Sequence, residues 1–151
     1  SRSSRYQHNI VMAILDLDKF KRINDTYGHL YGDYVIKEVA NIIREKVRNI
    51  DVVGRYGGEE YGILLIDTNI DKIVPVAKRI IEGISNYNFS MDNVDVKMTI
   101  SCGLAEYPQD SDKMNELIAK ADDAMYAAKA QGGNMVSVFS EESSDIQSES
   151  I

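Results

Sequence analysis

Residues 9–33 have the sequence NIVMAILDLDKFKRINDTYGHLYGD, and this stretch decides the fold class. Its first part, residues 9–17, is mostly apolar, contains no Gly or Pro and ends among carboxylates. Such a run predicts a buried β-strand whose C-terminal end carries functional groups. Residues 18–26 predict a short helix, which Tyr27 and Gly28 end. A buried strand that leads directly into a helix indicates a sheet with helices packed on it.

The rest of the chain continues this alternation. Apolar residues at helical spacing predict helices over residues 30–48, 69–85 and 113–131. Strand-like runs are found at residues 51–56 and 61–67 on either side of Gly57-Gly58, which indicates a hairpin, and at residues 94–104 and 135–139. The predicted order is strand, helix, helix, strand, strand, helix, strand, helix, strand. We therefore predict a single α/β (α+β) domain over residues 1–139, with a central mixed sheet flanked by helices. Residues 140–151 are rich in Ser and acidic residues and predict a disordered tail.

Charge and cysteine content narrow the function. The 151 residues carry a net charge of −7, which disfavours binding to nucleic acid unless a local basic patch exists. A nucleoside triphosphate remains compatible, because a metal ion and a few lysines neutralise it locally. Cys102 is the one cysteine and is expected in the core, so no intrachain disulfide can form. We expect a cytoplasmic domain, and we leave open a membrane-anchored parent protein with a sensor upstream.

Four acidic residues are predicted to meet at one edge of the sheet. Asp16 and Asp18 end the first strand, and Glu59 and Glu60 follow the two glycines of the hairpin. Neighbouring strands lie about 4.8 Å apart, so the hairpin tip can lie beside the first strand end. Carboxylates that converge repel one another unless a cation lies between them, and hard oxygen ligands suit Mg²⁺. An Asp-x-Asp pair at a strand end is usually only a solvated turn, and Gly-Gly-Glu-Glu alone is also a weak signal, so only their combination favours a function.

Longer motifs strengthen that combination. RYGGEEY at residues 55–61 resembles the GG(D/E)EF motif of the diguanylate cyclase, or GGDEF, domains. DLDKFKRINDTYGHLYGD at residues 16–33 is similar to the family's other hallmark, and residues 100–108 (ISCGLAEYP) and 121–134 (ADDAMYAAKAQGGN) are similar to its later blocks. The resemblance runs from about residue 9 to residue 139. It implies a nucleotidyl-cyclase-like GGDEF domain that joins two GTP into cyclic di-GMP and releases pyrophosphate.

The resemblance implies a Mg²⁺ site, with Mn²⁺ as a possible substitute. Its expected ligands are Asp16, Glu59 and the carbonyl of Leu17, and Glu60 either binds a metal or accepts a proton. Asp16, Glu59 and Glu60 are therefore the expected catalytic residues. Two metal ions there would clamp the triphosphate and lower the pKa of the attacking 3′-OH.

The resemblance also implies a phosphate site. Lys21 and Lys129 are expected to hold the phosphates as point charges, with help from backbone N–H groups near Phe20. Gly57 and Gly58 would let the backbone approach the phosphates closely.

Asn24 and Asp33 match the family's guanine-binding pair. A carboxylate only accepts hydrogen bonds, and guanine offers N1–H and N2–H₂ as donors, whereas adenine has an acceptor at N1. A mismatched buried polar pair costs about 1–3 kcal/mol, so Asp33 favours GTP over ATP.

Arg48 and Asp51 form an R-x-x-D pair, which in the family marks a product-inhibition site that binds cyclic di-GMP, and Arg79 is a candidate second arm. The alternative is an ordinary ion pair at a helix end, worth a few tenths of a kcal/mol.

The chain departs from the family pattern at three places. Tyr61 stands where the motif has Phe, so its hydroxyl needs a partner. Gly133 stands where many members carry a phosphate-binding arginine. The family's D-x-L-T-x-L-x-N-R segment, which links the cyclase to an upstream regulatory domain, is absent before the first strand.

Three functions remain open on the sequence. An active cyclase would work as a homodimer, because each monomer holds one GTP and supplies half of the reaction. A GTP or cyclic di-GMP sensor that has lost catalysis is the alternative, and the intact Asp16, Glu59 and Glu60 favour the enzyme over it. Asn24 and Asp33 disfavour a related cyclase or polymerase with another product.

Overall fold

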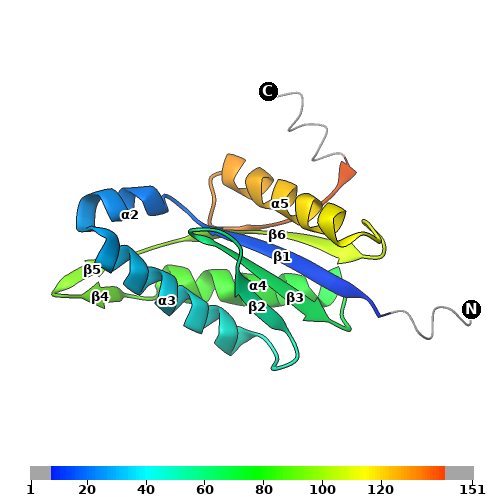
Figure 1. Cartoon of the computed structure of the whole chain (residues 1–151), viewed down its shortest axis with the longest axis horizontal. Helices are drawn as coiled ribbons and strands as arrows, with labels where there is room; N and C mark the ends of the chain where they lie inside the picture. Colours follow the sequence, from blue (N-terminus) through cyan, green and yellow to red (C-terminus); the bar gives the residue numbers. More distant parts are fainter. Residues whose placement is uncertain (1–7, 142–151) are drawn as a thin grey trace, which may run out of the picture.

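A computed structural model describes residues 8–141 and shows an α/β domain (Figure 1). The elements in chain order are β1 (Ile10–Leu17), α2 (Phe20–Tyr27), α3 (His29–Lys46), β2 (Val52–Arg55), β3 (Glu60–Ile66), α4 (Ile70–Asn86), β4 (Phe89–Met91), β5 (Val94–Val96), β6 (Ile100–Tyr107), α5 (Met114–Ala130) and β7 (Val136–Val138). None of these helices is both long and apolar enough to cross a membrane.

The main sheet has the strand order β2-β3-β1-β6-β7. Strand β1 lies at its centre and pairs antiparallel with both β3 and β6, while β7 pairs parallel with β6. Every residue of β1 after Ile10 is buried, as the apolar run predicted. The sheet is therefore mixed, which confirms the predicted fold class.

The two faces of β1 belong to different cores. Alternate residues of a strand point to opposite faces. Val11, Ala13, Leu15 and Leu17 belong to the larger hydrophobic cluster, which the residues of α3 and α4 complete. Met12 and Ile14 pack with buried residues of α5, and Figure 1 shows α5 on the opposite side of the sheet from α3 and α4. Asp16 continues the Met12 and Ile14 series and so faces α5.

Tyr61, which stands where the motif has Phe, lies in the larger hydrophobic cluster. Its side chain is fully buried, and its hydroxyl donates a hydrogen bond of 2.8 Å to the carbonyl of Ile36 in α3. The sequence analysis required a partner for this hydroxyl, and the structure supplies one. Cys102 is also buried, as predicted.

One predicted strand was wrong in its extent. Residues 94–104 were expected to form a single strand, but residues 94–96 pair with β4 in a separate two-stranded sheet and β6 begins only at Ile100. Asp92 and Asn93 adopt positive φ angles of 52° and 66° and make the tight turn between β4 and β5. The alternation of apolar residues was real on both sides of residue 97, but alternation reports the face of a side chain and not the partner of a strand.

The other predicted elements agree with the structure to within two or three residues at each end. The predicted disordered tail lies outside the described residues, apart from Ser140 and Glu141.

Candidate functional site

Asp16, near the end of β1, and Glu60, at the start of β3, face each other at one edge of the sheet. The register of β1 and β3 pairs these two residues directly, so their side chains share the face that α5 covers. Burial raises the pKa of Asp16, although Lys129 opposes that effect. Burial and then the charges of Asp16 and Asp122 raise the pKa of Glu60 to about 7. The two carboxyl groups therefore compete for one proton or one cation.

The ammonium group of Lys129 lies beside this pair. Lys129 is in the last turn of α5, and its Nζ is 3.3 Å from Asp16 Oδ1 and 3.2 Å from the carbonyl oxygen of Leu17. The structure thus brings together three residues that the sequence assigned to metal or phosphate binding, across more than 110 positions of the chain. The Lys129 ammonium therefore lies beside Asp16 and the Leu17 carbonyl, two of the groups that were expected to bind Mg²⁺.

Asp18 lies at the same edge of the sheet and also contacts the Lys129 ammonium. Its Oδ1 accepts hydrogen bonds from Ser101 Oγ at 2.7 Å and Lys129 Nζ at 3.1 Å. Its Oδ2 accepts from Thr99 Oγ1 at 2.6 Å and from the backbone N–H of Asn134 at 2.9 Å. Burial would raise the pKa of Asp18, but these hydrogen bonds hold it below the ordinary value. Asp18 was predicted only as one of the four converging carboxylates, without a role of its own.

Two further residues of α5 approach the carboxylates and were missed by the sequence analysis. Asp122 has a buried Oδ1 without a hydrogen-bond partner among the described residues, and burial with the charges of Asp123 and Asp16 raises its pKa. Tyr126 is 44% exposed, and burial with the charge of Asp122 raises the pKa of its hydroxyl. The spacing of 122, 126 and 129 in the sequence places all three on one helix face, and this was the available signal.

The hairpin tip lies over the end of β1, as predicted. The backbone N–H of Leu17 donates to the carbonyl of Glu59 at 3.3 Å, and the N–H of Gly57 donates to the carbonyl of Glu60 at 3.4 Å. Arg55 Nη2 donates to the carbonyl of Gly58 at 2.6 Å and braces the turn. The side chain of Glu59 forms no hydrogen bond or ion pair with any described residue. Its backbone therefore positions the tip while its carboxylate stays free.

A divalent cation fits the chemistry of these donors. Within residues 8–141, no three His, Cys, Asp or Glu side chains form a ready metal cluster. Mg²⁺ rarely uses such a cage, because it binds through one or two carboxylates and takes phosphate oxygens and water as its other ligands. Asp16, Glu60 and the Leu17 carbonyl provide this kind of partial set, and the Lys129 ammonium is a cation held by two of its members. The expected metal site is compatible with the structure without being complete in it.

The residues expected to bind guanine lie on α2 and α3. Asn24 has a buried Oδ1 that lacks a hydrogen-bond partner among the described residues. A Cβ at Gly32 would lie 1.9 Å from this oxygen, so the absence of a side chain there lets Asn24 reach α3 one residue before Asp33. Asp33 is exposed and forms no hydrogen bond with a described residue. The unpaired amide oxygen of Asn24 in α2 therefore lies beside Gly32, the residue of α3 that precedes the exposed Asp33.

The residues of α2 that were expected to contact phosphate make few contacts with the rest of the site. Phe20 begins the helix and is 5% exposed, while Lys21 is exposed and forms no ion pair with a described residue. The Lys21 ammonium therefore has no partner among the described residues, whereas the Lys129 ammonium is already held by Asp16, Leu17 and Asp18.

Arg48 and Asp51 form more than an ordinary helix-end pair. Asp51 has a side chain that is 1% exposed, and its carboxylate accepts hydrogen bonds from the N–H of Arg48, from the Arg48 guanidinium and from the N–H of Ile66. Burial would raise the pKa of Asp51, but these bonds lower it. Arg48 Nη2 also donates to the Ile66 carbonyl. Arg79 is exposed on α4 and makes no hydrogen bond or ion pair with the described residues, so the structure does not join it to the pair.

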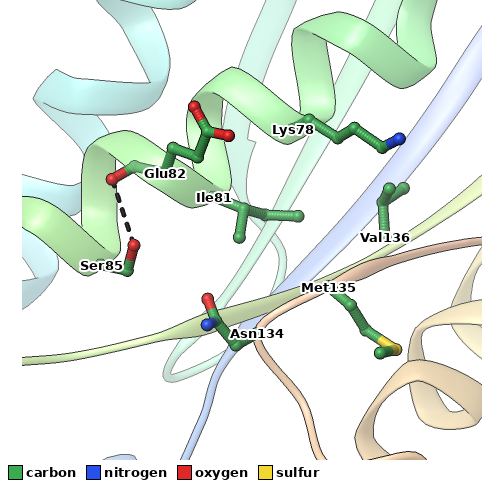
Figure 2. Close-up of a pocket in the computed structure, with 7 residues that line it drawn as sticks. All are labelled: Lys78, Ile81, Glu82, Ser85, Asn134, Met135 and Val136. Carbon is green, nitrogen blue, oxygen red and sulfur yellow. Dashed lines mark hydrogen bonds between the residues drawn. The ribbon is translucent and has the colours of Figure 1, made fainter.

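Two pockets lined by described residues lie away from these residues. One, of about 280 Å³, lies between α4 and the segment that leads into β7 (Figure 2), and it is lined by Lys78, Ile81, Glu82, Ser85, Asn134, Met135 and Val136. Another, of about 170 Å³, is an apolar groove along β2 and β3, lined by Met12, Val52, Gly54, Arg55, Tyr56, Gly62 and Leu64. Neither is lined by a residue that the sequence assigned to the site.

Comparisons with known proteins point to one family. A family model described as "Diguanylate cyclase, GGDEF domain" matches residues 1–135. Diguanylate cyclase A of Treponema denticola is 37% identical over 136 residues, which cover 90% of this chain and 37% of that protein. The chain thus spans little more than a third of the length of this relative.

Solved structures agree with the sequence match. The GGDEF domain of the Pseudomonas aeruginosa protein TpbB, or YfiN, has a TM-score of 0.91 at 30% identity, with 97% of this chain and 86% of that one covered. The GGDEF domain of DgcB from Caulobacter crescentus, in complex with c-di-GMP, has a TM-score of 0.82 at 32% identity, with 91% and 81% covered.

Proposed function

This chain belongs to the GGDEF family of diguanylate cyclases, and from that membership we propose that it condenses two GTP into cyclic di-GMP and pyrophosphate. The observation that carries the proposal is the meeting of Asp16, Glu60, Lys129 and the Leu17 carbonyl at one end of β1. From β1, β3 and α5, the oxygens can hold a divalent cation and the Lys129 ammonium can bind a phosphate oxygen, so together they can orient a triphosphate.

Each residue has a task in this proposal. Asn24 and Asp33 bind the guanine edge, and Lys21 and Lys129 bind phosphate oxygens, with the backbone at Phe20, Gly57 and Gly58 close to them. Asp16, the Leu17 carbonyl and Glu59 would hold Mg²⁺, or Mn²⁺ in its place, and Glu60 would either join these ligands or accept a proton. When bound, the metal would polarise the α-phosphate and make the 3′-OH more acidic.

Glu60 is the group best suited to take the proton from the 3′-OH. A general base works best when its pKa lies near the operating pH, and burial beside Asp16 brings the pKa of Glu60 to about 7. The 3′-oxygen of one GTP then bonds to the α-phosphorus of the other, and the bond to the leaving pyrophosphate breaks. Two such transfers close the ring of cyclic di-GMP.

The reaction requires two copies of the chain. Each site binds one GTP, so the attacking hydroxyl and the attacked phosphorus come from different protomers of a homodimer. An upstream regulatory domain in the full-length protein would control how the two sites meet.

Product inhibition is a further part of the proposal. Arg48, held by Asp51 and about half exposed, would bind a phosphate of cyclic di-GMP, with Arg79 as a second arm. The DgcB domain is a relative that was solved with c-di-GMP. An Arg48→Ala variant should lose inhibition by added cyclic di-GMP while it keeps its initial rate.

The decisive test is product formation. The chain at high concentration is incubated with GTP and Mg²⁺, and cyclic di-GMP is measured beside a Glu59→Ala variant. Product that disappears in the variant supports the cyclase. GTP binding without product, even after fusion of a dimerising coiled coil upstream, would favour the alternative, a GTP or cyclic di-GMP sensor without catalysis.

A further inference from the structure

The carboxylate of Asp18 is the most heavily bonded side chain at the site, yet the proposed reaction gives it no task. It accepts four hydrogen bonds, from Thr99, Ser101, Lys129 and the backbone of Asn134. Thr99 lies just before β6, Ser101 lies in β6, Lys129 lies in the last turn of α5, and Asn134 lies in the turn that follows α5. One side chain at the end of β1 therefore joins three other segments.

The number of donors matches the capacity of the acceptor. An ionised carboxylate offers about four lone-pair sites on its two oxygens. Each oxygen of Asp18 already accepts two hydrogen bonds, so a metal ion could bind there only by displacing a donor. Asp18 is thus a poor metal ligand, in contrast to Asp16 two residues before it.

Two of the donors cannot reverse their role. The hydroxyls of Thr99 and Ser101 can rotate to accept a hydrogen bond, but the Lys129 ammonium and the Asn134 N–H can only donate. They bind different oxygens of Asp18, Lys129 at Oδ1 and Asn134 at Oδ2. Both oxygens must therefore be acceptors at once, which a carboxylate provides and an amide does not.

These bonds determine where Lys129 lies. A lysine ammonium sits on a flexible four-carbon stem and has no preferred direction of its own. Here it is confined by three oxygens, those of Asp16, Leu17 and Asp18, at 3.1–3.3 Å. The bond from the Asn134 N–H also fastens the turn after α5 to β1, so the helix end that carries Lys129 is held as well.

We propose that Asp18 is a positioning residue: it holds the Lys129 ammonium beside Asp16 and the Leu17 carbonyl, ready to receive the phosphates of GTP. This proposal rests on the proposed function, because it takes Lys129 as a phosphate-binding group. Asp18 itself touches neither the substrate nor the metal.

The informative variant is Asp18→Asn. It keeps the shape of the side chain but replaces one acceptor oxygen with an NH₂ group, which must then face either Lys129 or the N–H of Asn134. Ser101→Ala is the matched control, because it removes a neutral donor from the same Oδ1 and leaves the carboxylate and Lys129 in place.

The first measurement needs no nucleotide. The ligand-free protein is treated briefly with acetic anhydride, and mass spectrometry compares acetylation of Lys129 with that of Lys37, an exposed lysine of α3. Asp18→Asn should raise the relative labelling of Lys129 about tenfold. Loss of a hydrogen bond between charged groups increases the population of the unbound ammonium by a factor of that order. Ser101→Ala should change it by less than about twofold.

The second measurement tests what the positioning serves. Titrations with Mg²⁺ compare guanosine with a GTP analogue that has a methylene bridge between its α- and β-phosphates and so cannot release pyrophosphate. Asp18→Asn should weaken binding of the analogue about tenfold and leave guanosine unchanged. A general loss of structure would instead weaken both ligands.

Each outcome decides a separate point. Unchanged labelling of Lys129 in a folded Asp18→Asn variant would overturn the proposal, and so would raised labelling with an unchanged ratio of the two affinities. If the wild type binds the analogue no better than guanosine, the proposed function fails, and the labelling alone decides whether Asp18 holds Lys129. Should Asp18→Asn not fold, Asp18→Glu, which displaces the carboxylate by one methylene, takes its place with the same expected results.

Discussion

Glu60→Gln is expected to stabilise the metal-free protein at pH 8 and to change its stability much less at pH 5. Glu60 lies opposite Asp16, and burial with the neighbouring negative charges raises its pKa from 4.5 to about 7. Below pH 4.5 the group is neutral in both the folded and the unfolded chain. Between pH 4.5 and 7 only the unfolded chain loses the proton readily, so folding becomes less favourable as the pH rises.

The size of the effect follows from the two pKa values. A difference of about 2.5 in pKa corresponds to at most about 3 kcal/mol of lost stability above pH 7. Glu60 is only partly buried and shares its proton with Asp16, so solvent screening reduces this to about 1–2 kcal/mol. Glutamine removes the charge while its NH₂ group can still donate to Asp16, so the variant should regain this amount at pH 8.

Urea denaturation at pH 5 and pH 8, with EDTA present, measures the difference. Glu59→Gln is the control, because it makes the same change of charge one residue earlier, at a side chain that has no bonded partner among residues 8–141. Added Mg²⁺ should stabilise the wild type more than Glu60→Gln. The reasoning is refuted if Glu60→Gln is less stable than the wild type at pH 8, or if it gains equally at both pH values.

Three further variants test single contacts. Tyr61→Phe removes the hydroxyl that donates to the Ile36 carbonyl in a fully buried position and should lower the free energy of unfolding by about 1 kcal/mol in urea; an unchanged midpoint would contradict this. Asp51→Asn should lower it by about 2 kcal/mol at pH 7 and by less at pH 3, because the lowered pKa of Asp51 gives stability that is present above pH 3.8 and is lost as the pH falls through the folded value. Equal losses at both pH values would argue against an ionised Asp51. Gly133→Ala should lower the melting temperature by an amount that corresponds to about 1–2 kcal/mol. Residue 133 has a φ of 75°, and the new Cβ would lie 2.7 Å from an Asp18 oxygen. A melting temperature equal to that of the wild type would show that the turn relaxes.

The fold class could be predicted from local patterns. The apolar run of residues 10–17 became the buried central strand, and the helical spacing of apolar residues placed α3, α4 and α5 correctly. These features depend on residues that are neighbours in the chain, and a period of two or 3.6 is visible without knowledge of any partner.

The sequence pattern did not show which strands pair with each other. Residues 94–96 and 100–104 show the same alternation, but the first group pairs with β4 and the second with β1. Register and pairing are set by which apolar faces are buried together, and a pattern along one strand does not specify the other strand.

The candidate site also has features that depend on the sequence alone and features that depend on tertiary packing. The sequence by itself determined which residue types are present, and the motif spacing placed Asp16 and Glu60 each at the end of a strand. Only the tertiary structure decided that β1 and β3 pair these two residues, that α5 brings Lys129 to them, and that Asp18 accepts bonds from residues more than 80 positions away. Hydrogen bonds and charge interactions act over a few ångströms in space, whatever the distance along the chain, so the packing of the sheet and α5 was needed to show them.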